Sequence, residues 1–409
     1  MPHPVHIAVT GLGLITPAGH DADAVWSAMC AGRGLAQKDP ELVGLPVDIA
    51  CRVEDFEPVA AHGRRLARRT DRFSHLALSA ARQAVVDAKL DPDTWSPTRI
   101  GVVLGTASNS LETYLEGFAL LGQERPTLVS PLSLPRSLPS AAAAEIAIDL
   151  GVRGPNFSVS SACASGATAL AVARDLIAAG ACDIVLAGGA ESARDRMTVT
   201  CLTQVRALSR RTDAPRLASR PFDTDRDGFV LSEGAAVLVL EHPDHALRRG
   251  AHIRARLRGY GSSCDAHHPV APHPEGAGAE QALRAALHNA GLAPRDIGHV
   301  NAHGTSSHAG DAAEAQALLR VFDGTPPPVT APKSVLGHPL GAAGAVEAAL
   351  TVLTLEQQLV PPTANLLRQD PGRELDVVTG RPRPVPVDAA LSNSFGFGGQ
   401  NTVLVFTTP

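Results

Sequence analysis

Two stretches in the first half of this 409-residue chain have counterparts, in the same order, in the second half. Residues 80–106, a helix-forming segment followed by a short apolar run, correspond to residues 279–305, and both stretches end in a Gly-Thr pair. The stretch around Cys163, with a helix-forming segment after it, corresponds to residues 329–355. A repeat that keeps its order predicts a duplicated structural unit.

Strand-like and helix-like segments alternate along the chain, which predicts an α/β fold rather than a helical bundle or a sandwich. With the duplication, this places one half at residues 1–250 and the other at residues 251–409, with functional loops meeting between them. The clearest expected elements are strands over residues 5–9, 100–104 and 183–189, helices over 73–90 and 137–150, and two antiparallel strands over 229–231 and 235–241.

Two stretches resemble ligand-binding motifs but lack residues that those motifs need. Residues 11–13 follow a strand, as in a dinucleotide-binding loop, yet the third glycine is missing and Pro17 stands where the phosphate-binding helix would begin. Asp223 begins a sequence like that of a calcium loop, but position 234 is a glycine and Glu233 comes one residue too early for the bidentate ligand. We expect a structural turn there and no bound metal.

Charge and cysteine content exclude several classes of protein. The net charge is −5 and there is no dense basic tract with aromatic residues, so we expect no nucleic-acid partner. No apolar run is long enough for a membrane span and no signal-peptide pattern is present, so we expect a cytoplasmic protein without membrane association. The six cysteines have no C-x-x-C spacing, which disfavours zinc and fits reduced thiols.

Cys163 lies where a short strand is expected to pass into a helix. β-branched and aromatic residues precede it, and the helix-forming run 167–176 follows. Unpaired N–H groups and the dipole at a helix N-terminus favour negative charge, so we expect this thiol to ionise more easily than a free cysteine. When Cys163 is considered alone, the alternative interpretation is a buried cysteine with a purely structural role.

Three later stretches have the composition of a catalytic site. His303 ends an expected strand between small residues, and His338 is expected to open a helix in a glycine-rich setting. For either histidine considered alone, the alternative interpretation is a core residue whose ring nitrogens have hydrogen-bond partners. Residues 392–401 form a strand that breaks into a Gly-rich turn, which either connects a hairpin or presents a backbone N–H to a developing negative charge.

Four segments together resemble the elongating β-ketoacyl-acyl-carrier-protein synthases. They are Ser161-Ala162-Cys163-Ala164-Ser165-Gly166, Asn301-Ala302-His303-Gly304-Thr305, Lys333-Ser334-Val335-Leu336-Gly337-His338 and Asn393-Ser394-Phe395-Gly396-Phe397-Gly398-Gly399. The likeness covers nearly the whole chain. It implies the thiolase fold, an α/β architecture of two duplicated halves in five layers, αβαβα, that usually forms a dimer.

The resemblance implies a decarboxylative Claisen condensation in two half-reactions. Cys163 attacks an acyl thioester delivered on the phosphopantetheine arm of an acyl carrier protein, and the backbone N–H groups of Cys163 and Phe397 hold the oxyanion. His303 and His338 then stabilise the enolate that forms when malonyl carrier protein loses carbon dioxide. Two imidazolium ions so close together would repel each other, so at least one histidine is expected to be neutral. No permanently bound cofactor is implied.

Supporting residues follow from the same resemblance. Lys333 is implied as an electrostatic member of the catalytic group, paired with Glu314, and Asp311 as further structural support. Phe397 is also the implied gate that admits the extender unit after acylation, because its flanking glycines permit movement.

Other residues are implied to contact the substrate. Thr305 and Ser307 resemble the positions that hydrogen-bond the pantetheine arm, although a threonine is more usual at position 307. Phe395 belongs to the Gly-rich turn. His268 lies in a loop over residues 264–273 that has no recognised metal-ligand spacing and is expected near the pantetheine tunnel.

Five arginines are candidates for docking an acidic carrier protein, since electrostatic attraction speeds encounter. Four share one amphipathic run and the fifth comes much later in the chain: Arg64, Arg65, Arg68, Arg69 and Arg206. A solvated face is the alternative for the first four. The expected assembly is a homodimer, or a heterodimer with a chain-length partner.

Two pathways and one other class of protein remain as alternatives. By resemblance, residues 197–201 and 232–236 favour a ketosynthase of a dissociated polyketide system, whereas residues 309–314 favour the fatty-acid branch. A non-catalytic chain-length subunit with the same fold typically lacks the nucleophile. The paired His303 and His338 disfavour an initiating synthase or a thiolase.

Overall fold

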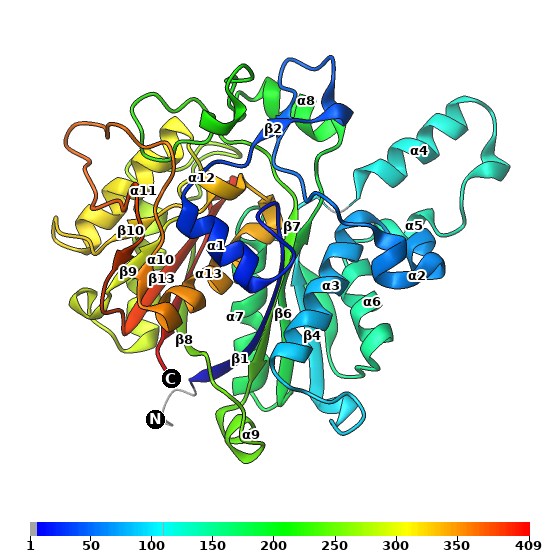
Figure 1. Ribbon diagram of the computed structural model, residues 1–409, viewed down its shortest axis with the longest axis horizontal. Helices are drawn as coiled ribbons and strands as arrows, with labels where there is room; N and C mark the ends of the chain where they lie inside the picture. The colour runs from blue at the N-terminus through cyan, green and yellow to red at the C-terminus, as the bar shows by residue number, and fades with distance from the viewer. Residues whose placement is uncertain (1–5, 109) are drawn as a thin grey trace.

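The computed structural model describes residues 6–108 and 110–409, in which ten strands form one mixed sheet (Figure 1). The two middle strands, β8 and β1, pair antiparallel through only three residue pairs, so each is the inner edge of one half. From edge to edge the order is β10 (Val329–Thr330), β9 (His299–Asn301), β13 (Ala389–Gly396), β14 (Gln400–Thr407), β8 (Ala255–Cys264), β1 (Ile7–Ile15), β7 (Gly234–Glu241), β6 (Ile184–Glu191), β4 (Ile100–Gly105) and β5 (Asn156–Val159).

The two sides of this sheet have the same topology. Outward from β1, the steps to β7 and β6 are antiparallel and the steps to β4 and β5 are parallel. Outward from β8, the steps to β14 and β13 are antiparallel and those to β9 and β10 are parallel. The predicted duplication is confirmed. The division at residue 250 falls in the turn before β8, and as a boundary between domains it stays a prediction.

Helices complete the five-layered arrangement. The outer face of the first half is covered by α3 (Arg72–Asp87) and α6 (Ala141–Leu150), and that of the second half by α10 (Ala277–Ala290) and α11 (His308–Val321). Between the halves lie α7 (Ser165–Ala178) and α13 (Ala343–Gln357), which pack on each other and contact strands of both halves (Figure 1). The expected αβαβα layering of the thiolase fold is therefore present.

The remaining elements are short or peripheral. The helices are α1 (Ala22–Ala31), α2 (Pro58–Arg69), α4 (Leu111–Gly122), α5 (Ser133–Ser137), α8 (Arg196–Gln204), α9 (Pro243–Arg248) and α12 (Lys333–Leu336). Two strand pairs lie outside the main sheet: β2 (Gln37–Lys38) with β3 (Ile49–Ala50), and β11 (Leu359–Val360) with β12 (Arg383–Pro384).

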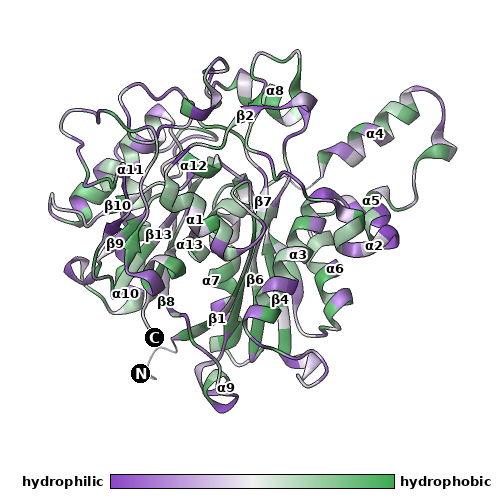
Figure 2. Cartoon of the chain, viewed as in Figure 1, coloured by the Kyte–Doolittle hydropathy of each residue, from purple (hydrophilic) through white to green (hydrophobic). Residues whose placement is uncertain are grey.

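The central helix α13 explains why the two halves stay together. Its sequence is apolar on every side and it is buried along nearly its whole length, as such helices must be. Figure 2 shows the apolar residues concentrated on the central strands and helices. Small residues let α13 approach its neighbours closely, since a Cβ added to Gly344 would lie 2.6 Å from the Ala167 nitrogen and 2.8 Å from the Ser394 hydroxyl.

Three sequence predictions need correction. The helix expected over residues 137–150 begins only at Ala141, because Pro139 interrupts it. Residues 229–231 do not pair with β7; they form isolated parallel bridges to Leu208 and His338. Strand β1 continues through residues 11–13, where glycine is needed because a Cβ on Gly13 would lie 1.9 Å from a carbonyl oxygen of α3.

An arm over residues 111–138, containing α4 and α5, projects from the body of the molecule (Figure 1). It carries a set of exposed large apolar side chains: Leu115, Phe118, Leu121, Leu128, Leu132, Leu134 and Leu138. Despite this apolar surface, no helix within residues 6–108 and 110–409 is long and apolar enough to cross a bilayer.

We expect Gly344→Ala to lower the free energy of unfolding by about 1–3 kcal/mol, the usual cost of an extra methyl group in a packed core. The measurement is the urea midpoint or Tm of the purified protein. Gly117→Ala is the matched control, because a Cβ at this position of α4 meets nothing within 4 Å. An equal Tm for Gly344→Ala and the wild type would contradict the proposed close packing.

Candidate active site

Cys163 occupies a tight turn between β5 and α7. The residue before it, Ala162, has a φ of 49°, a left-handed conformation that costs a non-glycine residue of order 1 kcal/mol. The Ser165 hydroxyl stabilises the turn by accepting from the Ser161 N–H at 2.9 Å and donating to the Ala162 carbonyl at 2.6 Å. The turn holds the sulfur close to the N-terminus of α7.

The thiol is buried, with 7% of Cys163 exposed. Burial raises the pKa of Cys163 to about 11, although the positive charge of Lys333 and a hydrogen bond from the Phe397 N–H oppose this shift. The prediction that the helix N-terminus makes this thiol easier to ionise is therefore wrong for the resting protein. Loss of hydration of the thiolate outweighs the Lys333 charge and the Phe397 N–H.

The Gly-rich turn after β13 lies directly against the nucleophile. A Cβ on Gly396 would lie 2.7 Å from the Ser161 carbonyl oxygen and 3.0 Å from the Cys163 nitrogen, so only glycine fits. This close approach brings the Phe397 N–H to the Cys163 sulfur. The expected strand and turn in this region are confirmed.

Two histidines from the second half face the same place. His303 follows β9, and the ring centroids of His303 and His338 are 5.5 Å apart at an interplanar angle of 85°. His338 does not open a helix as expected, because Gly337, with a φ of 70°, ends α12 and α13 begins only at Ala343. Instead, the His338 N–H donates to the Val230 carbonyl at 2.8 Å, which fixes the turn.

Lys333 determines the tautomer of His303. Its ammonium group donates to the His303 carbonyl oxygen at 2.6 Å, to the His303 Nδ1 at 3.2 Å and to the Glu347 carboxylate. An ammonium group has only donors, so Nδ1 must accept and the proton of the neutral ring must lie on Nε2. The predicted pairing of Lys333 with Glu314 is wrong; the ion-pair partner is Glu347 on α13.

Both catalytic-site histidines are neutral. Burial is the main cause that lowers the pKa of His303 and of His338 well below its usual value, and the positive charge of Lys333 lowers both further. The prediction that at least one of them is neutral is confirmed.

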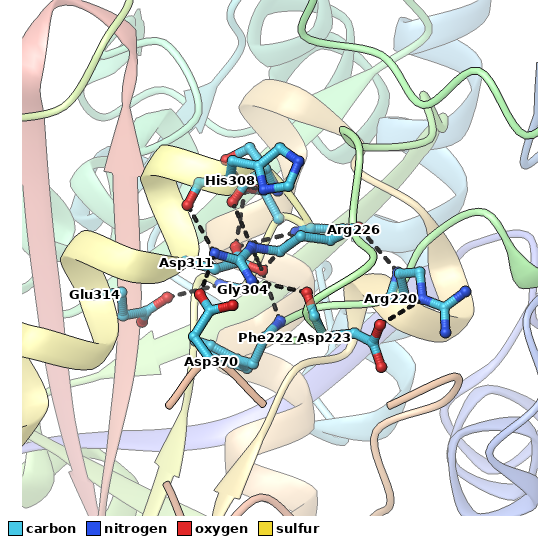
Figure 3. A network of polar contacts seen from close by, with 12 residues as sticks. Arg220, Phe222, Asp223, Arg226, Gly304, His308, Asp311, Glu314 and Asp370 are labelled. Atoms are coloured by element: carbon cyan, nitrogen blue, oxygen red, sulfur yellow. Dashed lines mark hydrogen bonds and ion pairs between the residues drawn. The ribbon is translucent and has the colours of Figure 1, made fainter. Parts of the chain in front are cut away.

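Glu314 holds the loop that carries His303. Its carboxylate accepts from the His303 N–H at 2.9 Å, from the Gly304 N–H at 2.8 Å and from the Asn393 side-chain amide at 3.0 Å. Asp311 does the same one turn earlier on α11 (Figure 3), where it accepts from the Ser306 N–H at 3.1 Å. Burial raises the pKa of Asp311 to about 7, with the Arg226 charge opposing the shift.

A cavity of about 90 Å³ joins these groups. Cys163, His303 and His338 line it, together with Thr305 and Ser307, whose hydroxyl oxygens are 2.8 Å apart. The described residues contain no group of three or more His, Cys, Asp or Glu arranged to hold a metal ion. The site thus combines a thiol, an N–H donor, two neutral imidazoles and a pair of hydroxyls.

Comparison with known proteins agrees with this geometry. Residues 5–246 match the N-terminal domain of the β-ketoacyl synthases and residues 254–367 match their C-terminal domain. The chain belongs to the β-ketoacyl synthase family. The resemblance read from four sequence segments is confirmed, and the protein is an acyltransferase of the condensing type, a ketosynthase with the thiolase fold.

Individual relatives are similar to this synthase over their whole length. The 3-oxoacyl-[acyl-carrier-protein] synthase 2 of Synechocystis is 40% identical, covering 98% of this chain and 97% of the relative. The ishigamide ketosynthase/chain length factor structure has a TM-score of 0.93 and 34% identity, covering 99% of this chain and 100% of that one. The structure of a type II polyketide synthase acyl carrier protein in complex with its ketosynthase has a TM-score of 0.92 and 29% sequence identity, covering 100% of both chains.

Most of the sequence-predicted site residues meet in the synthase at one cavity. Its lining includes Cys163, His303, His338, Thr305, Ser307, Glu314, Phe395 and Phe397. Lys333 and Asp311 are buried behind this lining. His268 is exposed and lies outside it; its ring nitrogen accepts from the Val270 and Ala271 N–H groups, both at 3.0 Å.

The five docking arginines do not form one patch. Four of them follow Gly63, whose non-helical angles kink α2 just before Arg64. Arg69 pairs with Glu145 at 2.5 Å, whereas Arg64, Arg65 and Arg68 are exposed. Arg206 is exposed beyond the end of α8, which Figure 1 shows apart from α2.

Sequence reasoning missed Glu347 and Asp265. Glu347 has only apolar neighbours in the first half of α13, and a carboxylate there signals a buried charge that needs a partner, so it was detectable in principle. Asp265 lines the cavity and accepts from the Asn401 side chain at 2.8 Å and from the His273 N–H at 2.8 Å. Nothing in its local sequence distinguishes it from a loop aspartate.

We expect alkylation of Cys163 by iodoacetamide to rise about tenfold per pH unit from pH 7 to pH 9 without a plateau. A raised pKa keeps the thiolate fraction small and proportional to hydroxide over this range. Peptide mass mapping measures the rate at Cys163, and the Cys163→Ala variant identifies its peptide. A plateau below pH 8 would show that the thiol is already ionised.

We expect Glu347→Ala to lower the free energy of unfolding by about 3–5 kcal/mol, because Lys333 would be left as an unpaired buried charge. The double variant Lys333→Met/Glu347→Leu should recover part of this loss, since it removes both charges. Urea unfolding measures each free energy. Lys38→Ala, which breaks an exposed ion pair with Asp48, should cost less than about 1 kcal/mol. A double variant no more stable than Glu347→Ala would contradict the pairing.

Proposed function

We propose that this synthase joins a malonyl unit to an acyl chain held on Cys163, with loss of carbon dioxide. The observation that carries the proposal is the cavity connecting the Cys163 sulfur with the neutral rings of His303 and His338. Acyl transfer needs a nucleophile beside an oxyanion donor, and decarboxylation needs uncharged donors for an enolate oxygen. Both sets of groups lie on this one cavity.

In the first half-reaction the Cys163 thiolate attacks the carbonyl carbon of an acyl thioester. The S–C bond to Cys163 forms, the carrier thiolate leaves, and it takes up the proton that Cys163 gave up. The Phe397 N–H at the sulfur and the Cys163 N–H are the oxyanion donors, and the loss of one such donor costs about 2.7–4 kcal/mol in hydrolases. Burial leaves few thiolates, but a thiolate of high pKa is the stronger nucleophile.

In the second half-reaction the malonyl thioester loses carbon dioxide. The electron pair of the broken C–C bond becomes an enolate, whose oxygen accepts from the Nε2–H of His303 and from His338. The enolate carbon then attacks the acyl carbonyl, the C–S bond to Cys163 breaks, and the Cys163 thiolate that leaves takes up a proton from water. Lys333 serves this step indirectly, since it fixes the His303 tautomer and adds to burial, the main cause, in keeping that ring neutral.

Substrates arrive on the phosphopantetheine arm of an acyl carrier protein. The Thr305 and Ser307 hydroxyls bind the arm, and Phe395, whose ring lies 5.8 Å from that of His303, packs beside it. A related ketosynthase has been solved in complex with its carrier protein, which supports this partner. Arg64, Arg65, Arg68 and Arg206 are the proposed docking residues, with Arg69 weakened by its Glu145 pair.

Phe397 is the proposed gate between the two half-reactions. It is half-buried at the start of a Gly-rich turn in which Gly398 has a φ of 77°. Among the backbone bonds described outside regular elements, two hold the turn to the loop over residues 264–273: the Gly398 N–H donates to the Pro269 carbonyl at 2.8 Å, and the Asp265 N–H donates to the Gly399 carbonyl at 2.9 Å. Rotation of Phe397 would widen the cavity once Cys163 is acylated.

The synthase works as a dimer in this proposal. The apolar arm over residues 111–138 and the unpaired edge of β5 both need a covering partner, because exposed apolar patches and free strand edges favour association. That partner is a second copy or a chain-length subunit, as in the ishigamide structure. The six unpaired cysteines support a reducing, cytoplasmic location.

Fatty-acid and polyketide pathways both remain open for the product, because relatives of both kinds share this chemistry. The alternative function, a non-catalytic chain-length subunit, is disfavoured by the complete cavity around Cys163 and both histidines.

The two half-reactions are separable by variants. Intact mass spectrometry after addition of acyl carrier protein should show the acyl mass on the wild type and on His303→Ala and His338→Ala, and not on Cys163→Ala. Decarboxylation of malonyl carrier protein should persist in Cys163→Ala. It should fall about 10²-fold or more in either histidine variant, the usual effect of losing one oxyanion donor.

Cys201→Ala is the control, because Cys201 is exposed on α8 away from the cavity. Acylation of Cys163→Ala would overturn the assignment of the nucleophile. If the folded wild type gains no acyl mass, repeating the reaction with a co-purified chain-length partner separates an obligate heterodimer from a wrong assignment.

A further inference from the structure

The Asp223–Gly228 turn, which begins like a calcium loop in the sequence, contains a buried arginine that holds the active-site loop. Figure 3 shows the Arg226 side chain directed at the start of α11. Arg226 is 3% exposed, and its guanidinium donates to the Ser307 carbonyl at 3.2 Å and to the His308 carbonyl at 2.9 Å. It also donates to the Asp223 carbonyl and to the Asp370 carboxylate, both at 2.7 Å.

The loop that Arg226 holds has an unfavourable conformation. Ser306 has a φ of 73°, which a non-glycine residue keeps only when its surroundings enforce it. The enforcing contacts come from the turn and the residues just before it: the Gly228 N–H donates to the Ser306 carbonyl at 3.0 Å, and the Arg220 N–H donates to the Ser306 hydroxyl at 3.0 Å. Asp311, 3.8 Å from Arg226, accepts the Ser306 N–H.

Ser306 stands between the two hydroxyl residues of the cavity, so its conformation sets their positions. Thr305 and Ser307 line the cavity, with hydroxyl oxygens 2.8 Å apart. Arg226 does not line it. Any effect of Arg226 on substrate therefore passes through the backbone of residues 305–308.

We propose that Arg226 is a positioning residue whose guanidinium clamps the Ser307 and His308 carbonyls and thereby sets the affinity of the synthase for the phosphopantetheine arm. This rests on the proposed function, in which the arm occupies this cavity. Arginine suits the task because its planar group donates in several directions at once. Lysine keeps the charge beside Asp311 and Asp370, but its single ammonium cannot reach every one of these acceptors.

The test is Arg226→Lys, assayed with malonyl-pantetheine and acyl-pantetheine thioesters that carry no protein. We expect KM for both to rise about tenfold, equivalent to the loss of about 1.4 kcal/mol or one to two hydrogen bonds. kcat should stay within about twofold of the wild type and the alkylation rate of Cys163 should be unchanged. General loosening of the fold would change kcat and alkylation as well.

Arg211→Lys is the matched control, because Arg211 donates to the Asp225 carbonyl of the same turn at 2.6 Å without contacting residues 305–308. It should leave KM unchanged. Asp370→Asn is a milder second variant, because it removes only the ion pair between Arg226 and the partly exposed Asp370. We expect it to raise KM about twofold to threefold, in line with an ion pair worth roughly 0.5 kcal/mol, which keeps the proposal testable if Arg226→Lys does not fold.

Wild-type KM in both variants would overturn the proposal, as would parallel losses of kcat and alkylation. If the wild type itself, with or without a partner subunit, never acylates Cys163, the proposed function fails and this inference fails with it. If the wild type condenses normally and KM does not move in either variant, only the role of Arg226 is refuted.

Discussion

The buried ammonium group of Lys333 is the interaction on which the rest of the site depends. It lies between the Glu347 carboxylate on the central helix and the backbone and ring of His303. An ion in such a place is tolerated only with a partner and with its donors satisfied. Because α13 lies between the two halves, the Lys333–Glu347 pair connects the central helix of the core to the catalytic His303.

The same ammonium group decides which proton His303 can offer. With Nδ1 occupied by a donor, the neutral ring has its proton on Nε2. Burial keeps both histidines uncharged, so they stabilise an enolate as hydrogen-bond donors rather than as cations. The Lys333 charge therefore fixes the His303 tautomer, while burial, which keeps both histidines neutral, also suppresses ionisation of Cys163.

The duplication explains why residues so distant in sequence meet. Cys163 follows β5 and precedes α7 in the first half, and His338 lies between the corresponding β10 and α13 in the second. His303 follows β9, the counterpart of β4. Equivalent loops from the two related halves of the sheet converge on one cavity, and each half contributes different chemistry to it.

The sequence by itself determined the α/β class, the duplication, the family and the residues at the centre of the cavity, because these depend on periodicity and on short motifs whose parts are adjacent in the chain. It failed where the outcome depends on contacts between distant segments. The partner of Lys333 is Glu347 rather than Glu314, the thiol of Cys163 is made harder to ionise by burial, and residues 229–231 pair with the His338 turn rather than with β7. Ion pairing, desolvation and strand pairing are set by which groups tertiary packing brings together and removes from water, and no local pattern contains that information.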